Sequence, residues 1–506
     1  MQDSNRKLIL AGLLAGILMA AMDNTIVVTA MGTIIGELGG MDKFTLVASA
    51  YMTTELAGML IYGKLADIYG RKPFYLAGLC LFMGGSLLCA NAHTMVQLYL
   101  YRALQGMGAG ALVPLAYTII FDVVPQAERG KIAGLFGAVF GLSSILGPIL
   151  GAYLTDYVGW RWIFYINVPL GLVSFILLLR FYHEDTQHLG QDLDWPGALF
   201  LITSIVSLMA FLQRAGGSQD PSSLPVDGLL ISFILFMALF IYQERRSANP
   251  VLPLELFRGR LFAASQGVGF FYCAVYIPVA IYIPIYVQGV FGGTATSAGG
   301  VLAPMMLASV AGSQFAGRKA IGTSYRRLML ISCLLFFSGI LSLGTLNVSS
   351  PRWLLTMLMI ITGLGMGFSW SVLSMASNHG LEYRQRASAN STLSFSQTLG
   401  MTLGISILGA LQNFIMRQSL NRAFQGPDLA KMSQDARVLL QPVVRDQFSP
   451  EALNTMSGIL ANSITTVFHY SLLFIIIALV FIIMMGSAGL NASQAGDTVS
   501  RDNEFS

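Results

Sequence analysis

The chain is 506 residues long, with 55% apolar and only 11% charged residues. A soluble chain of this length would be about a quarter charged, so the composition argues against a soluble enzyme, a nucleic-acid-binding protein and a disordered scaffold. The net charge of +4 is small and dispersed, which gives no reason to expect nucleic acid as a partner. We therefore expect a polytopic membrane protein whose surroundings are the lipid bilayer.

Fourteen apolar runs are long enough to cross a bilayer, which takes roughly 20 mostly apolar residues in a helix. The first run follows Arg6 and Lys7 as a secretory signal would, but it is too long and Asp23 interrupts it, so we expect a retained helix. The predicted spans are 8–31, 44–62, 73–90, 96–118, 131–153, 161–181, 195–213, 226–243, 261–288, 297–317, 326–346, 353–375, 387–416 and 456–487.

The distribution of Lys and Arg predicts the orientation of these spans. With the N-terminus inside, most of the 29 basic residues fall in inner loops, and the short outer loops hold few of them. This is the asymmetry that the positive-inside rule describes. We therefore predict an even number of spans, with both termini in the cytoplasm.

A short basic inner loop that begins with Gly recurs at corresponding places in two halves of the chain. It runs from Gly63 to Lys72 after the second span and from Gly317 to Lys319 after the tenth. Such a weak repeat is typical of transporters with a site between two halves near the midplane. We predict an all-α polytopic fold of two six-helix bundles with an inserted two-helix hairpin. The predicted parts are 1–185 (first bundle), 186–250 (hairpin with linkers), 251–490 (second bundle, including a polar, partly helical outer loop at 417–455) and 491–506 (cytoplasmic tail).

Three ionisable residues lie inside predicted spans: Asp23 in the first, Glu55 in the second and Arg102 in the fourth. A charge within the hydrocarbon costs a few kcal/mol by insertion scales, so it marks a pathway or a partner. The opposing effects of burial and a nearby cation suit a carboxylate that takes up and releases a proton. Asp23 with Arg102 is therefore a candidate proton-coupling pair. The alternative is a permanent ion pair that joins the two helices.

Glu55 shares a helix face with Tyr51, Met59 and Tyr62. A carboxylate among aromatic and Met side chains suits a lipophilic cation, through charge pairing and cation–π contact. We predict that Glu55 is a second proton site or a counter-charge for the substrate; the alternative is a buried acid satisfied by its neighbours.

Aromatic residues in later spans are further candidates for the substrate pocket, because such side chains suit flat apolar ligands. Tyr residues at helix ends also serve as interfacial anchors. Together with Tyr51, Glu55 and Met59, the candidate pocket contains Tyr272, Tyr276 and Trp370.

No pattern in the sequence predicts a cofactor or a metal. The cysteines lie in apolar runs without a CxxC pair, which predicts neither a zinc site nor a disulfide framework. The sequence has no Gly-x-x-x-x-Gly-Lys-Ser/Thr loop, so we do not expect ATP to drive the protein. The five histidines are scattered, which disfavours a membrane-embedded enzyme.

Five motifs in chain order carry a resemblance to a known family. They are Met22–Val27, Gly63–Lys72, Tyr101–Gly108, Gly141–Gly151 and Trp160–Pro169. On these residues the chain resembles the major facilitator superfamily, and specifically its fourteen-helix drug:proton antiporters. The match covers nearly the whole chain.

The resemblance implies roles for several of these residues. It assigns the coupling proton to Asp23 and a cytoplasmic gate to the first inner loop. In the fifth span it implies a tightly packed antiporter motif, where Pro148 also bends the helix. The gate residues are Gly63, Asp67, Gly70, Arg71 and Lys72, and the antiporter motif contains Gly141, Gly147, Pro148 and Gly151.

We therefore predict a monomeric, proton-coupled multidrug efflux antiporter of the cell membrane. It exports hydrophobic, cationic compounds by alternating access, so its partners are lipophilic small molecules and protons. The first alternative keeps the fold but exports a specific endogenous metabolite, peptide or lipid. More remote alternatives are a membrane-embedded enzyme, a passive channel or a sensor.

Overall fold

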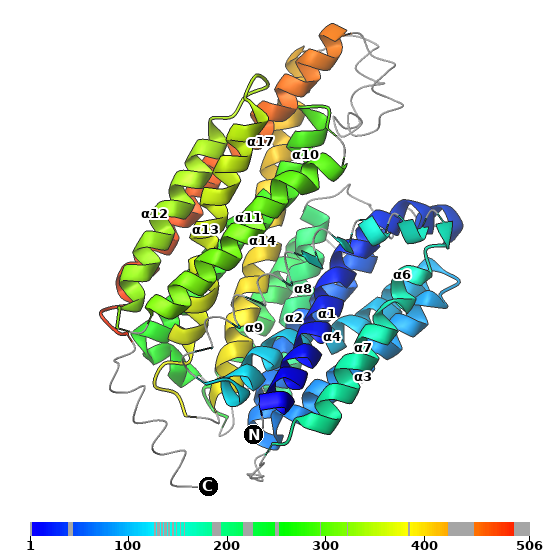
Figure 1. Ribbon diagram of the computed structural model, residues 1–506. Helices are drawn as coiled ribbons and strands as arrows, with labels where there is room; N and C mark the ends of the chain where they lie inside the picture. The colour runs from blue at the N-terminus through cyan, green and yellow to red at the C-terminus, as the bar shows by residue number, and fades with distance from the viewer. Residues whose placement is uncertain are drawn as a thin grey trace. The chain divides into compact units, whose positions relative to one another are not determined.

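The computed structural model describes most of the chain as helices (Figure 1). The described residues are 3–38, 44–125, 128, scattered positions between 132 and 155, 157–184, 194–215, 226–247, 252, 254–293, 295–320, 322–382, 385–423 and 450–489. Among these residues, β-type pairing is confined to one isolated bridge between Ser324 and Gly489.

The chain forms two compact units, Met1–Ala263 with Ser374–Phe395, and Ala264–Leu373 with Ser396–Ser506. The first unit contains α1 (Asp3–Leu38), α2 (Phe44–Tyr69), α3 (Arg71–Ala90), α4 (Met95–Val123), α6 (Trp162–Tyr165), α7 (Asn167–Phe181), α8 (Trp195–Ala215), α9 (Val226–Glu244) and the 3-10 helix η2 (Leu254–Arg258). The second contains most of α10 (Arg260–Gly289), α11 (Ala295–Lys319), α12 (Tyr325–Gly344), α13 (Arg352–Ser377), α14 (Arg386–Ala423) and α17 (Pro450–Met484). α10, α13 and α14 each have one end in the first unit.

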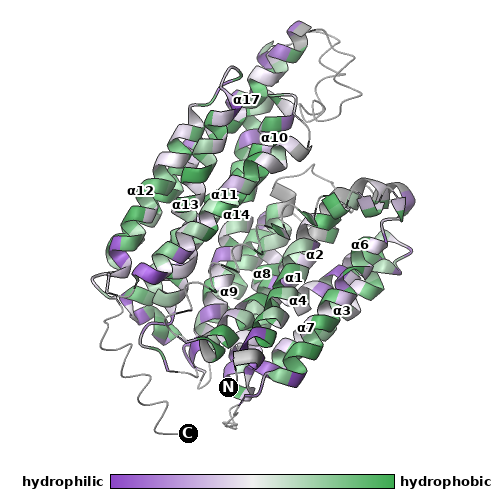
Figure 2. Cartoon of the chain, in the orientation of Figure 1, coloured by the Kyte–Doolittle hydropathy of each residue, from purple (hydrophilic) through white to green (hydrophobic). Residues whose placement is uncertain are grey.

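Twelve helices among the described residues are long and apolar enough to cross a bilayer. Large apolar side chains on their surfaces are exposed, such as Ile176 on α7 and Val480 on α17, as a lipid environment requires. Hydrophilic residues gather towards the helix ends (Figure 2). The described part of the chain thus has the helical build of a membrane protein.

Two of the fourteen predicted spans, 44–62 and 131–153, are not among these twelve helices. α2 covers 44–62 as one continuous helix, although it is not among the twelve. The run 131–153 lies largely outside the described residues, as do the middle of the outer loop 417–455 and the tail 491–506.

The predicted span 161–181 is divided into α6 and α7 around Ile166. Pro169, in the first turn of α7, has no N–H to donate to the carbonyl of Tyr165, one turn earlier. Ile166 keeps right-handed helical angles (φ −62°, ψ −24°), so the path of the span continues. The interruption leaves Asn167 as the first residue of α7, where it is buried.

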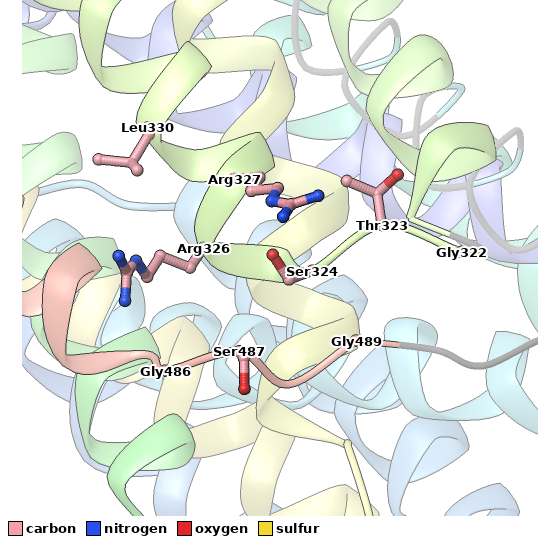
Figure 3. Close-up of a pocket in the computed structure, with 9 residues that line it drawn as sticks. All are labelled: Gly322, Thr323, Ser324, Arg326, Arg327, Leu330, Gly486, Ser487 and Gly489. Carbon is pink, nitrogen blue, oxygen red and sulfur yellow. The ribbon is translucent and has the colours of Figure 1, made fainter.

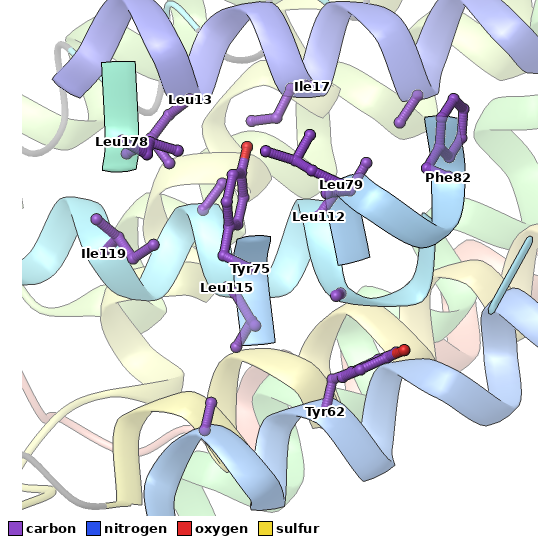
Figure 4. Packing of buried hydrophobic residues seen from close by; sticks show 14 of the residues in the cluster. Leu13, Ile17, Tyr62, Tyr75, Leu79, Phe82, Leu112, Leu115, Ile119 and Leu178 are labelled. Carbon is purple, nitrogen blue, oxygen red and sulfur yellow. The ribbon is translucent and has the colours of Figure 1, made fainter. Parts of the chain in front are cut away.

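Apolar side chains of α1, α3, α4 and α7 build the core of the first unit around Tyr75 and Phe82 (Figure 4). The surrounding residues include Leu13, Ile17, Leu79, Leu112, Leu115, Ile119 and Leu178. This core holds the four helices side by side.

Glycines allow α4 to approach its neighbours closely. A Cβ on Gly106 would overlap the backbone oxygen of Tyr51 on α2, and one on Gly110 would lie 2.6 Å from the backbone oxygen of Glu55. On the other side of α4, a Cβ on Gly85 of α3 would lie 2.7 Å from the Cα of Gln105. Small residues that bring backbones together are the usual basis of helix packing in membranes.

We predict that Gly106→Ala destabilises the protein by about 1–3 kcal/mol, because the added methyl group forces α2 and α4 apart. Thermal unfolding in detergent measures the change. Gly84→Ala on α3 is the matched control, since its Cβ would meet nothing within 4 Å. The control should be neutral or stabilising by about 0.5–1 kcal/mol, because Gly is entropically costly within a helix. Equal destabilisation by both substitutions would contradict the close-packing explanation.

Candidate functional site

Asp23 on α1 and Arg102 on α4 form an ion pair inside the first unit, between the Oδ2 of Asp23 and the Nη1 of Arg102. Asp23 is 0% exposed and Arg102 is 2% exposed. Two opposite charges at such depth compensate part of the large cost of removing each from water. The structure thus brings together the two residues that the sequence singled out as a pair.

Three uncharged polar side chains complete a network around the Asp23 carboxylate. Its Oδ1 accepts hydrogen bonds from the Nε2 of Gln105 at 2.9 Å and the Nδ2 of Asn167 at 2.8 Å. Arg102 Nη1 also donates to Gln105 Oε1 at 2.8 Å. The hydroxyl of Ser86 on α3 accepts from Asn167 at 3.0 Å and donates to the carbonyl of Phe164 at 2.9 Å. The Asp23 carboxylate of α1 is therefore surrounded by polar side chains from three other helices, α3, α4 and α7.

The network leaves two buried polar atoms without a hydrogen-bond partner in the described part of the chain: the Nε of Arg102 and the Oδ1 of Asn167. A buried polar atom without a hydrogen bond destabilises the folded protein. Such an atom therefore calls for an explanation, for example a functional role. Protonation of Asp23 would remove the charge that holds its donors, so the same atoms could exchange partners. The geometry suits a group that switches between two hydrogen-bonding arrangements.

The aromatic ring of Tyr51 on α2 lies against the Arg102 guanidinium, with 4.1 Å between the guanidinium carbon and the ring centroid. This is a cation–π distance. Glu55 follows one helical turn later and is half-buried, and no hydrogen bond or ion pair joins it to any residue that the structure describes. Arg102 and Asp23 are the charged groups that act on it electrostatically. Glu55 is therefore a carboxylate beside the ion pair with no neutralising contact of its own.

The segment Gly63–Lys72, predicted as an inner loop, is helical except at Gly70, because α2 continues to Tyr69 and α3 starts at Arg71. This segment, the predicted gate loop, places a carboxylate at the start of another helix. Asp67, near the end of α2, accepts hydrogen bonds from the backbone N–H groups of Ala387 at 3.0 Å and Ser388 at 2.8 Å, in the first turn of α14. A helix N-terminus attracts a negative charge through its unsatisfied N–H groups. Gly63 allows this approach, because a Cβ there would overlap the side chain of Ser391.

A second carboxylate binds the start of α3 in the same way. Glu184 accepts hydrogen bonds from the backbone N–H groups of Arg71, at 2.8 and 3.0 Å, and of Lys72, at 2.9 Å. Gly70 precedes them with a φ of 97°, in the left-handed region that favours glycine. Nothing in the sequence marks Glu184, because an acid after a helix looks like an ordinary loop residue.

Asp67 lies beyond the apolar run 44–62, and its ionisation is shifted. Desolvation raises the pKa of Asp67 to about 7, against the opposing effects of the hydrogen bonds from Ser388 and Ala387 and of the Arg71 charge. Lys64 lies about one turn before Asp67 on α2. It interacts electrostatically with Asp67 and with Glu244 at the end of α9. The end of α9 therefore lies within electrostatic reach of the gate loop.

Only part of the predicted antiporter motif lies among the residues that the structure describes. Gly147 packs on α1, where a Cβ would overlap the hydroxyl of Thr25, two residues after Asp23. Gly151 is buried. Gly141 and Pro148 lie outside the described residues.

The residues predicted to line a pocket fall in both units. Met59 is buried in the first unit. In the second unit Tyr276 and Trp370 meet edge to face, with ring centroids 6.2 Å apart. Tyr272 is buried and stacks on Phe336 at 5.0 Å, so it is also part of that unit's core. Whether these residues bind a substrate stays a prediction.

A model of the Major Facilitator Superfamily matches residues 13–405. The chain belongs to this superfamily. It is 46% identical over 493 residues to Multidrug resistance protein 3 of Bacillus subtilis (strain 168), covering 96% of both chains. It is 30% identical over 524 residues to Multidrug transporter protein MdtP of the same organism, covering 99% of this chain and 97% of the relative.

A solved structure shares the fold of this superfamily member. The human organic anion transporter MFSD10 has a TM-score of 0.58 at 13% identity, covering 93% of this chain and 99% of that chain. Superfamily membership makes the chain a transporter and not an enzyme, and it confirms the prediction of a multi-pass protein of the cell membrane.

We predict that Arg102→Gln alone destabilises the transporter by about 3–5 kcal/mol, because it leaves the Asp23 charge buried without its partner. The double variant Asp23→Asn with Arg102→Gln should recover part of this loss, since no buried charge remains. Denaturant unfolding of the two single variants and the double variant in detergent measures the coupling. Additive effects would show that the two side chains do not stabilise one another.

We also predict that pH changes the stability contributed by Asp67. Because the pKa of Asp67 in the folded protein lies above its ordinary value, the folded state holds a proton that the unfolded chain has released. This contribution is present at low pH and is lost as the pH rises through about 7. Wild type should therefore lose stability relative to Asp67→Asn between about pH 5 and pH 8, measured by thermal unfolding. A difference that stays constant over this range would contradict the assignment.

Proposed function

We propose that this transporter is a proton-coupled multidrug efflux antiporter that exports hydrophobic, cationic compounds by alternating access. It works as a monomer with fourteen membrane-spanning helices and both termini in the cytoplasm. Its bundles are residues 1–185 and 251–490, and α8 and α9 form the inserted hairpin within 186–250. The proposal rests on the buried network around Asp23, supported by the likeness to Multidrug resistance protein 3 and MdtP.

In the proposed cycle a proton from outside neutralises Asp23 and ends its charge pairing with Arg102. Charge-assisted hydrogen bonds to the carboxylate, roughly twice as strong as neutral ones, become weaker. Gln105 and Asn167 can then change partners, which favours a second arrangement of the helices. Exchange of one proton for one monovalent cation moves no net charge, so the pH difference drives it. One pH unit is worth about 1.4 kcal/mol, enough for a drug gradient of about tenfold.

Glu55 supports the assignment of a cationic substrate. Its carboxylate has no hydrogen bond or ion pair with the described residues, and the Tyr51 ring one turn away already lies against a cation, the Arg102 guanidinium. A lipophilic cation would gain charge pairing with Glu55 and cation–π contact with an aromatic side chain. The other role open to Glu55 is that of a second proton site.

The gate loop supports alternating access. The hydrogen bonds between Asp67 and the first turn of α14 connect the end of α2 to a helix far along the chain. We propose that this contact closes the cytoplasmic side and breaks when that side opens. Arg71 and Lys72 assist by fixing the start of α3 on Glu184.

The first alternative function is export of a specific endogenous metabolite, peptide or lipid on the same fold. A narrow range of transported compounds would favour it. The relatives Multidrug resistance protein 3 and Multidrug transporter protein MdtP are named for multidrug transport, which favours the broader range.

We predict that Asp23→Asn abolishes proton-coupled export while substrate binding remains. Purified protein in liposomes with an imposed pH gradient is tested with a panel of dyes and drugs, and substrate-induced proton flux is recorded. Glu255→Gln is the control, because Glu255 is an exposed acid on η2 and its loss should leave coupling intact. Proton flux that persists in Asp23→Asn would falsify the coupling role of this residue.

The same assay separates the two roles of Glu55. If Glu55→Gln reduces export of cationic compounds and spares neutral ones, Glu55 recognises substrate. If it abolishes proton flux for every compound, Glu55 is a proton site.

A further inference from the structure

One end of the second unit contains a cavity of about 600 Å³ where the start of α12 meets the chain after α17 (Figure 3). The backbone N–H of Tyr325 donates to the carbonyl of Ala488 at 2.9 Å, and Gly322 and Gly486 turn the chain with φ of 83° and 71°. The lining residues are Gly322, Thr323, Ser324, Arg326, Arg327, Leu330, Gly486, Ser487 and Gly489.

The cavity is strongly basic. Arg326 and Arg327 are exposed in the first turn of α12, and neither forms an ion pair or a side-chain hydrogen bond with the residues that the structure describes. The side chain of Ser324, the N-cap residue, makes no capping hydrogen bond. Figure 3 shows these three residues on one side of the cavity and Gly486, Ser487 and Gly489 on the other. Two guanidinium forks at a helix N-terminus match the geometry and charge of a phosphate group.

An apolar surface continues from this basic cavity along the membrane-spanning helices. Leu330 lines the cavity, and Leu334, one turn further along α12, is 70% exposed. α17 packs beside α12 and exposes Val480 and Ile483. Both helices are long and apolar enough to cross the bilayer. A small soluble phosphate would leave this surface unused, whereas the acyl chains of a phospholipid would cover it.

We propose that the cavity binds the phosphate group of an anionic phospholipid whose acyl chains lie along α12 and α17. Basic pockets at the ends of membrane-spanning helices are the chemistry that recognises such headgroups. The site belongs wholly to the second unit, and it does not depend on the proton-coupling assignment of Asp23.

The test uses the full-length protein in detergent, titrated with dioleoylphosphatidylglycerol, dioleoylphosphatidylcholine or inorganic phosphate. Retained lipid is counted by native mass spectrometry, and thermal unfolding gives the binding curve. We expect saturable binding of phosphatidylglycerol, and weaker binding of both phosphatidylcholine and inorganic phosphate. Binding of phosphatidylcholine as tight as that of phosphatidylglycerol, or of inorganic phosphate as tight, would overturn the proposal.

Paired variants locate the binding. Arg326→Gln with Arg327→Gln should weaken phosphatidylglycerol binding about tenfold or more. Arg318→Gln with Lys319→Gln is the matched control, since it removes two exposed basic residues from the end of α11 that do not line the cavity. Equal weakening in both pairs would show attraction by general charge and would overturn the site.

Ser324→Asp separates binding from folding. Asp serves as well as Ser at an N-cap, so in phosphatidylcholine alone the variant should unfold at a temperature no lower than that of wild type. The new carboxylate would pair with the arginines and repel phosphate, so phosphatidylglycerol binding should fall about tenfold. A variant that folds normally and binds phosphatidylglycerol like wild type would contradict the proposal.

Discussion

The burial of the Asp23 carboxylate within a membrane-spanning unit constrains the rest of the first unit. A charge at this depth persists only with compensating charge and hydrogen bonds, and the partners come from different helices: Arg102 and Gln105 from α4 and Asn167 from α7, with Ser86 of α3 behind them. These contacts set the depth and rotation of each helix relative to α1. The glycines of α4 make the required approach sterically possible.

In the first unit, carboxylates bind the N-termini of three helices. Asp67 binds the start of α14, Glu184 the start of α3, and Asp194 the N–H of Gly197 at the start of α8. Each satisfies N–H groups that the helix itself leaves unbonded. The start of α12 differs, because two arginines stand there and no acid among the described residues pairs with them. That difference leaves the start of α12 suited to an external anion.

Sequence reasoning found the charged members of the site and missed the uncharged ones. Asp23 and Arg102 are conspicuous because a charge in an apolar run is costly and rare. Asn167 lies 144 positions from Asp23 in the chain and Gln105 lies 82, and an amide in a membrane helix is too common to signal a role. Two hints were available: both amides lie in motifs that carry the family resemblance, Tyr101–Gly108 and Trp160–Pro169, and Gln105 lies three residues after Arg102 on one helix face.

In the gate loop, too, the sequence identified the residues and the structure identified their contacts. The family resemblance selected Asp67 as a gate residue, and the structure places it at the start of α14. Glu55 stood out as an unusual acid with three possible roles, and the structure leaves it beside Arg102 without a neutralising contact. The basic residues of α12 were assigned only to topology, because the cavity exists only where the chain after α17 returns to them.

The sequence by itself determined that the chain is a membrane protein, where most of its spans lie and which ionisable residues lie within them. The physical reason is that the bilayer acts on each residue through its own hydropathy, so the effect can be summed along a single run. The tertiary structure decided which groups surround Asp23, which helix Asp67 binds and where a basic cavity opens. Those outcomes depend on helix packing, which brings together residues that are far apart in the chain.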